Sequence, residues 1–227
     1  MRRRIVGEPL QYLLGEWEFY GYPFKVGKGV LIPRPETELL VDAAKQHNPR
    51  LVLDLCAGTG CVGVSLAKEL GCNVIAVEKS PEACEYLKAN IKLNKTEQKV
   101  TVINDDVLNM SESFAADCIL INPPYLSKEE MLALQKEVAY EPTLALYGGD
   151  DGLGFYRAFF KAWGTRLNRD NLFFATEVGD KQANEVCRLM KDIGLSPETI
   201  EDFNGIKRVV CNAKGNNNVA RRNPLNV

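Results

Sequence analysis

Apolar, strand-like segments alternate with amphipathic, helix-like segments from Leu51 to Asn212. This alternation predicts a mainly parallel, doubly wound sheet with helices on both faces. The last two apolar segments are joined only by a short turn at Asn204-Gly205. We expect these two strands to pair antiparallel, because a parallel pair would need a long crossover connection. The expected fold is therefore α/β, with five parallel strands followed by an antiparallel hairpin.

The expected elements divide the chain into three parts. A small β-hairpin is expected over residues 16–32 and a helix over 36–46, separated by Pro33-Arg34-Pro35. Strands are expected at residues 51–55, 73–78, 100–104, 117–122, 172–178, 198–203 and 207–212, and helices at 59–70, 81–93, 128–138, 154–166 and 181–193. We expect an N-terminal segment over 1–35, a main domain over 36–214, and a flexible tail over 215–227. This order is typical of the class I methyltransferase variant of the Rossmann-like fold.

Composition excludes several classes of protein. The formal net charge is −2 and hydrophobic residues make up 45% of the chain, as in a globular protein with a substantial core. The acidic balance argues against broad attraction to nucleic acid or to anionic membrane surfaces. No apolar run approaches the roughly 18 residues of a spanning helix, and Gly7 to Pro9 interrupt the stretch that follows the N-terminal arginines. We expect a cytoplasmic protein with no membrane partner.

Cysteine and histidine restrict the chemistry further. The seven cysteines include no C-x-x-C pair, so we expect reduced, mostly buried thiols. The single histidine, His47, excludes a multi-histidine metal site. We expect His47 to lie at the surface near a helix end, and we expect no metal.

A glycine-rich loop follows the first strand of the main domain. Gly58, Gly60 and Gly63 have the spacing of a dinucleotide-binding loop, and Glu78 follows twenty residues after Gly58. A nicotinamide-binding protein is therefore one hypothesis. Asp54 favours another, because a carboxylate beside the loop would repel a pyrophosphate. The sulfonium and ammonium groups of S-adenosylmethionine are cationic and suit that carboxylate.

Acidic side chains end three successive strands of the expected sheet. Asp54 lies at the end of the first strand, Glu78 at the end of the second and Asp106 just after the third. The carboxyl ends of parallel strands meet at one edge, so we expect the three acids to converge on one crevice.

The fourth strand runs into Asn122-Pro123-Pro124-Tyr125. The prolines donate no N–H and hold Asn122 extended. The Asn122 side-chain carbonyl and the Pro123 main-chain carbonyl then form two fixed acceptors. They match the two N–H groups of a planar NH₂, and Tyr125 can cover its face. A carboxamide and a nucleobase amine both fit this description.

The chain resembles the HemK/PrmC family of protein-(glutamine N5) methyltransferases, which modify the glutamine of a Gly-Gly-Gln motif in peptide chain release factors. The resemblance runs from Gly7 to about Cys211 and includes residues 7–15, 19–21, 31–38, 54–63, 122–125, 141–142, 148–152, 177–179 and 202–209. It implies an S-adenosylmethionine-dependent enzyme whose partner is a release factor. It also implies that residues 1–35 are the remnant of a linker to a helical domain that family members usually carry before the Gly7 segment.

The resemblance assigns site residues motif by motif. The expected cofactor contacts are Asp54, from the charge argument above, and, from the resemblance, Cys56, Ala57, Gly58, Thr59, Gly60, Glu78, Asp106, Val107 and Asn122. Residues 122–125, which are Asn122, Pro123, Pro124 and Tyr125, bind the substrate amide, and Asn122, Pro123 and Tyr125 act in catalysis. The chain departs from many members at Cys56 and Ala57, where they have Gly and Thr.

Two alternatives stay open at this point. An adenine-N6 type nucleic-acid methyltransferase would use the same acceptor site, but it would need a basic footprint that net charge −2 does not offer. A cofactor-binding protein without activity would bind S-adenosylmethionine and methylate nothing. For the glutamine reaction we expect no general base and no role for His47.

Overall fold

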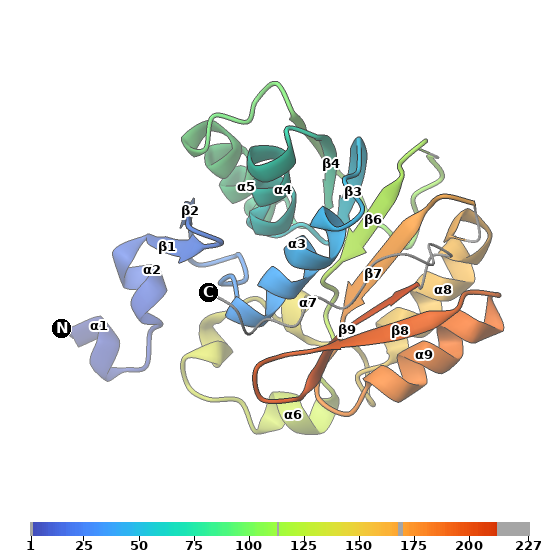
Figure 1. Cartoon of the computed structure of the whole chain (residues 1–227). Helices are drawn as coiled ribbons and strands as arrows, with labels where there is room; N and C mark the ends of the chain where they lie inside the picture. Colours follow the sequence, from blue (N-terminus) through green and yellow to red (C-terminus); the bar gives the residue numbers. More distant parts are fainter. Residues whose placement is uncertain (1, 113, 168–169, 213–227) are drawn as a thin grey trace.

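The computed structural model describes residues 2–112, 114–167 and 170–212 and contains two sheets (Figure 1). The expected tail at 215–227 lies outside the described residues, as does the end of the expected domain at 213–214. A two-stranded antiparallel sheet contains β1 (Glu16–Phe19) and β2 (Tyr22–Lys25). A seven-stranded sheet contains β3 (Leu51–Leu55), β4 (Asn73–Glu78), β5 (Val100–Asn104), β6 (Cys118–Ile121), β7 (Phe173–Glu177), β8 (Pro197–Glu201) and β9 (Lys207–Asn212).

The strand order of the large sheet is β5-β4-β3-β6-β7-β9-β8. Strands β3 to β7 run parallel, and β9 is antiparallel to both β7 and β8. The predicted fold is therefore confirmed, including the antiparallel last hairpin. The order reverses direction at β3, and this is the point where open α/β sheets form their ligand crevice.

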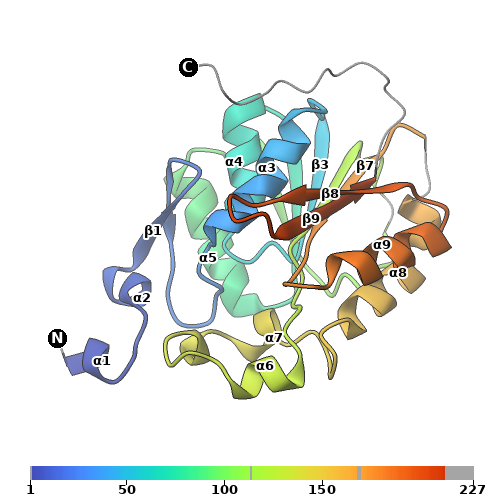
Figure 2. The same ribbon diagram turned by 60° about the horizontal axis from the view of Figure 1, so that its bottom comes forward.

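Helices cover both faces of the sheet (Figure 2). One core cluster contains side chains of α3, α4 and α5, and the other contains side chains of α8 and α9. The helices are α1 (Arg2–Ile5), α2 (Leu10–Leu14), α3 (Glu38–Lys45), α4 (Cys61–Leu70), α5 (Pro81–Leu93), α6 (Lys128–Leu132), α7 (Thr143–Leu146), α8 (Gly154–Leu167) and α9 (Ala183–Asp192), with 3-10 turns η1 (Pro35–Thr37) and η2 (Val138–Tyr140).

Of the six expected helices, only the one over 81–93 has the expected bounds; four others shift by one or two residues at one or both ends, and one is much shorter. The helix expected over 128–138 ends at Leu132, because α6 buries no side chain and so has no core contact to extend it. A capping box between Ser127 and Glu130 starts this helix. The helix expected from Thr59 begins at Cys61, because Gly60 has a left-handed φ of 79°. Helices α1, α2 and α7 were not predicted, since runs of four or five residues carry no periodic signal.

Asn90 on α5 fastens the N-terminal hairpin to the main domain. The Asn90 side chain accepts a hydrogen bond from the Lys25 N–H at 2.6 Å and donates to the Lys25 carbonyl at 3.1 Å. It also donates to the carbonyl of Thr59, in the glycine-rich loop, at 2.9 Å. The side chain is fully buried. One carboxamide therefore connects the hairpin, helix α5 and the loop after β3.

We expect Asn90→Ala to lower the free energy of unfolding by about 2 to 3 kcal/mol, because it leaves the buried Thr59 carbonyl and the partly buried Lys25 N–H and carbonyl without these partners. Denaturant unfolding of the two proteins measures this difference. Lys92→Ala on the same helix is the control, because Lys92 is exposed, and its stability should stay within about 0.5 kcal/mol of the wild type. Equal stability of Asn90→Ala and Lys92→Ala would contradict the fastening role.

In the part of the chain that is described, no helix is long and apolar enough to cross a membrane. All seven cysteines lie in the described residues; none forms a disulfide, and five are buried. His47 is exposed just after α3, and its ring stacks on Phe173 with ring centroids 3.8 Å apart.

Candidate functional site

Two neighbouring cavities lie at the carboxyl edge of the large sheet, with volumes of about 500 Å³ and about 590 Å³. The first is lined in part by residues at or after the ends of β3, β4, β5 and β6. The second is lined mainly by residues between positions 122 and 146, which follow β6, and by Glu177 at the end of β7. Four residues line both cavities: Leu31, Arg34, Asn122 and Ala145. Asn122 therefore stands between a cavity on the glycine-loop side and a cavity on the Tyr125 side.

The structure brings nearly all predicted site residues to these walls. The first cavity is lined by Asp54, Cys56, Ala57, Gly58, Thr59, Glu78, Asp106, Val107, Asn122 and Pro124. Tyr125 lines the second cavity. Gly60 lies behind the first wall, where it begins α4. Pro123 is buried and is not among the residues that line either cavity.

Asp54 holds the glycine-rich loop in place. Its Oδ2 accepts a hydrogen bond from the Gly63 N–H at 2.9 Å, in the first turn of α4. A Cβ on Gly63 would lie 2.8 Å from the same oxygen, so only glycine fits there. Asp54 is 3% exposed, and burial raises its pKa to about 7. The Gly63 hydrogen bond lowers the pKa of Asp54 and offsets part of the effect of burial, and the nearby charge of Glu78 raises it by a smaller amount.

Cys56 occupies a backbone position that glycine adopts more easily. Its φ is 58°, in the left-handed region where a Cβ meets the following carbonyl. Of the two positions where the chain departs from many family members, Cys56 and Ala57, only Cys56 has a strained backbone. The side chain lines the first cavity, and burial raises the pKa of the thiol, which keeps it protonated.

Glu78 joins two segments of the first cavity. Its Oε2 accepts the Gly58 N–H at 2.8 Å and its Oε1 accepts the Ser80 N–H at 2.7 Å. Burial raises its pKa, although these backbone hydrogen bonds favour the carboxylate. A carboxylate has about four lone-pair positions, so both oxygens can still accept hydrogen bonds from a ligand hydroxyl.

Asp106 is the third predicted acid of the first cavity. It accepts hydrogen bonds from the Leu108 N–H at 3.0 Å and from Asn109, and it forms an ion pair with Lys79 at 2.9 Å. Burial alone would raise its pKa, but Lys79 and these donors together hold the pKa below its usual range. The three acids therefore line one cavity, as predicted, and each has a different environment.

A chain of hydrogen bonds extends from Asn122 into the protein. Asn122 Nδ2 donates to Thr37 Oγ1 at 3.2 Å, and Thr37 Oγ1 donates to Glu177 Oε2 at 2.6 Å. Tyr125 Oη donates to the other Glu177 oxygen at 3.3 Å. Glu177 is 2% exposed, and burial raises its pKa to about 7. Sequence reasoning assigned no role to Thr37 or Glu177, although both lie in segments 31–38 and 177–179 that carry the family resemblance.

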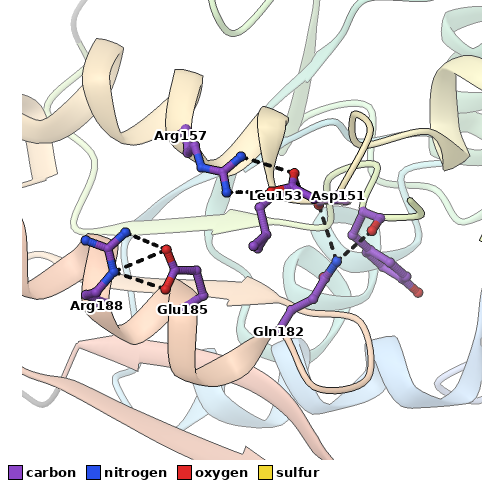
Figure 3. A network of polar contacts seen from close by, with 8 residues as sticks. Asp151, Leu153, Arg157, Gln182, Glu185 and Arg188 are labelled. Carbon is purple, nitrogen blue, oxygen red and sulfur yellow. Dashed lines mark hydrogen bonds and ion pairs between the residues drawn. The ribbon is translucent and has the colours of Figure 1, made fainter. Parts of the chain in front are cut away.

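Gln182 holds the backbone of Tyr125, and sequence reasoning missed it (Figure 3). Its Nε2 donates to the Tyr125 carbonyl at 2.8 Å and to the Gly152 carbonyl at 3.3 Å. Its Oε1 accepts the Gly179 N–H at 3.0 Å. One carboxamide thus connects the turn after β6 with the glycine-rich segments at 148–152 and 177–179.

The glycines of the 148–152 segment allow that close approach. A Cβ on Gly148 would lie 2.6 Å from the Pro124 carbonyl oxygen and 2.7 Å from Tyr125 Cα. Real Cβ atoms essentially never approach backbone atoms this closely. Small residues at these positions therefore allow the Asn122–Tyr125 turn to pack against its neighbour.

The N-terminal side of the site is held by an ion pair. Arg34, which lines both cavities, pairs with the buried carboxylate of Glu141. Glu141 also accepts the Ile32 N–H at 2.9 Å. The site therefore draws on residues from both sides of the domain boundary expected at residue 35, and that boundary stays a prediction.

The side chains around the two cavities offer acceptors of hydrogen bonds. In residues 2–112, 114–167 and 170–212, no group of three or more His, Cys, Asp or Glu side chains could hold a metal ion. The first cavity offers carboxylates for hydroxyl and amine groups, and Asn122 offers a carboxamide toward both cavities.

Comparisons with known proteins show which proteins the chain is similar to. The family model described as TRM5/TYW2 methyltransferase domain matches residues 34–144. The release factor glutamine methyltransferase of Thermodesulfovibrio yellowstonii is 37% identical over 219 residues, which cover 92% of this chain and 78% of that protein. The release factor glutamine methyltransferase of Geobacter sulfurreducens is 40% identical over 213 residues, which cover 92% of this chain and 74% of that protein.

Solved structures show the same fold at low sequence identity. A methyltransferase from Pyrococcus furiosus has a TM-score of 0.62 and 18% identity, with 86% of this chain and 89% of that chain covered. The hMettl16 catalytic domain has a TM-score of 0.68 and 12% identity, with 89% and 87% covered. These likenesses concern the fold alone.

Proposed function

The chain belongs to the release factor glutamine methyltransferase family, and on that premise we propose that it methylates the side-chain amide nitrogen of a glutamine in a peptide chain release factor. The methyl donor implied by family and fold is S-adenosylmethionine. The observation that carries the proposal is the position of Asn122 on the wall shared by the two cavities. A donor in one cavity and an acceptor in the other would meet at this side chain.

The polar side chains that line the first cavity fit the proposed cofactor. Glu78 would accept hydrogen bonds from the ribose hydroxyls, and Asp106 would lie near the base, beside the apolar side chains of Val107 and Leu108. Asp54 and the loop at 56–60 would face the methionine end. When bound, S-adenosylmethionine supplies an activated methyl group on a sulfonium. The protein then has mainly to align this methyl with the acceptor nitrogen.

The acceptor nitrogen is the difficult partner in the proposed reaction. A carboxamide nitrogen is a poor nucleophile, because its lone pair is delocalised into the carbonyl group. The Asn122 side-chain oxygen and the Pro123 main-chain oxygen would each accept one of its N–H hydrogens, while Tyr125 covers one face. These hydrogen bonds strengthen as positive charge develops on nitrogen, so they favour the transition state over the bound substrate.

The proposed acceptor is the glutamine of the Gly-Gly-Gln motif, and the proposed setting is the cytoplasm, where release factors act. Radiolabelled S-adenosylmethionine is offered to a release factor, to the same factor with that glutamine changed to alanine, and to duplex DNA and RNA. We expect label only in the unmodified factor. Labelled nucleic acid, with affinity that falls steeply as salt rises, would replace this proposal with a nucleic-acid methyltransferase.

A short Gly-Gly-Gln peptide at high concentration separates docking from chemistry. It needs the pocket at residues 122–125 but little remote docking surface. Label in the peptide and none in the release factor would mean that the chain has the chemistry and lacks a docking surface. An unlabelled peptide, together with measured binding of S-adenosylmethionine, would instead favour a cofactor-binding protein without activity.

A further inference from the structure

Thr37 lies between Asn122 and the buried carboxylate of Glu177, and it comes from a part of the sequence far from both residues. Thr37 closes the turn η1, Asn122 follows β6, and Glu177 ends β7. The Thr37 hydroxyl lies 3.2 Å from Asn122 Nδ2 and 2.6 Å from Glu177 Oε2. Thr37 is 1% exposed and Glu177 is 2% exposed, so water does not compete for these hydrogen bonds.

The single proton of the Thr37 hydroxyl determines the direction of the hydrogen bonds that link Asn122, Thr37 and Glu177. An ionised carboxylate only accepts hydrogen bonds, and 2.6 Å is the length of a charge-assisted O–H···O bond. When Glu177 is ionised, the Thr37 hydroxyl therefore donates its hydrogen bond to Glu177. The Thr37 oxygen then has only lone pairs to offer Asn122, so it must face the NH₂ end of the Asn122 carboxamide.

The direction of these hydrogen bonds also determines where the oxygen of the Asn122 carboxamide lies. With Nδ2 turned to Thr37, Asn122 Oδ1 points away from it, toward the cavities that Asn122 lines. The reverse orientation would present two N–H donors to the N–H groups of a substrate amide. The two ends of a carboxamide have nearly the same shape, so packing alone does not discriminate between these orientations.

We propose that Thr37 and Glu177 are positioning residues that turn the Asn122 carboxamide so that its oxygen faces the acceptor nitrogen. The catalytic effect of this orientation rests on the proposed function, but the orientation itself is present in the protein without substrate. Tyr125 is coupled to the same carboxylate through its hydroxyl. Glu177 thus fixes Tyr125 directly and Asn122 through Thr37, and it also lines the second cavity.

Two substitutions at Thr37 test the role of the hydroxyl. Thr37→Val keeps the shape and removes the hydroxyl, and Thr37→Ser keeps the hydroxyl. At pH 8.5, where Glu177 is ionised, we expect Thr37→Val to lower kcat on the Gly-Gly-Gln peptide at least tenfold. We expect Thr37→Ser to retain at least a third of wild-type kcat. The Kd of S-adenosylmethionine should stay within about threefold in both variants.

Glu177→Gln and Thr96→Val provide the matched comparisons. In Glu177→Gln, the new NH₂ group can donate a hydrogen bond to the Thr37 hydroxyl. Thr37 would then donate to Asn122 Oδ1, and the Asn122 carboxamide would be reversed. We therefore expect Glu177→Gln to lose at least as much kcat as Thr37→Val. Thr96 is equally buried and donates only to the Ile91 carbonyl, away from the cavities. Thr96→Val should keep wild-type kcat.

A measurement without substrate keeps the inference separate from the proposed function. The Asn122 side-chain NH₂ signal is identified by ¹⁵N NMR from its absence in Asn122→Asp. We expect one of its hydrogens to exchange with solvent at least tenfold more slowly in the wild type and Thr37→Ser than in Thr37→Val. If the wild-type protein does not methylate the peptide, the proposed function fails and this exchange measurement alone decides the positioning role.

The inference would be overturned by wild-type kcat in Thr37→Val, by an equal loss of kcat in Thr37→Ser, or by exchange rates that do not differ between the wild type and Thr37→Val. A loss of S-adenosylmethionine affinity equal to the loss of kcat would also overturn it, because Thr37 lines the first cavity and would then act on the cofactor.

Discussion

Asn122→Ala is expected to lower turnover of the Gly-Gly-Gln peptide by about a hundredfold or more, while the Kd of S-adenosylmethionine changes much less. Loss of one preorganised partner of transition-state charge costs about a hundredfold to a thousandfold in other enzymes. The hydrogen-bond chain explains the size of the effect here, because the Asn122 side chain is already held by Thr37 before substrate binds. Single-turnover kinetics with saturating cofactor measures the loss on the chemical step.

His47→Ala is the control for that experiment. His47 is exposed, stacks on Phe173, and lines neither cavity, so its removal should leave turnover near the wild-type value. A large loss in His47→Ala with none in Asn122→Ala would mean that the acceptor site lies elsewhere. If cofactor affinity in Asn122→Ala fell as far as turnover, Asn122 would be a residue of the cofactor cavity only.

Sequence reasoning predicted the fold well because strand and turn signals are local. Strands β3, β4, β5 and β9 have the predicted bounds, since apolar runs in this sheet are bounded by glycine, asparagine or charged residues. The glycine-rich loop and the three acids were placed at one edge by topology alone. The helix at 128–138 was wrong, because its extent depends on tertiary contacts that periodicity does not report.

The supporting residues of the acceptor pocket could not be predicted in the same way. Thr37 and Glu177 are separated by 140 positions, and Gln182 and Tyr125 by 57. Nothing in a single sequence says that such residues will meet. Thr37 and Glu177 lie inside segments that carry the family resemblance, whereas Gln182 lies outside them, so only the fold assigns Gln182 its role.

Glu78→Ala is expected to weaken S-adenosylmethionine binding by about 1.5 to 3 kcal/mol, the range for hydrogen bonds to a charged group. This corresponds to a Kd about ten to two hundred times higher, which calorimetry can measure directly. Glu78 also holds the Gly58 and Ser80 N–H groups, so the substitution loosens two walls of the cavity as well as removing ligand contacts.

That double contact gives a sharper expectation for Glu78→Gln. Both carboxylate oxygens accept from backbone N–H groups, so whichever way a glutamine turns, its NH₂ meets a donor. We therefore expect Glu78→Gln to weaken binding nearly as much as Glu78→Ala, whereas Glu85→Ala, at an exposed position on α5, should leave the Kd unchanged. Binding of NADH by the wild type, without binding of S-adenosylmethionine, would return the glycine-rich loop to a dinucleotide site. Wild-type affinity in Glu78→Gln would mean that the second oxygen of Glu78 is not needed to shape the cavity.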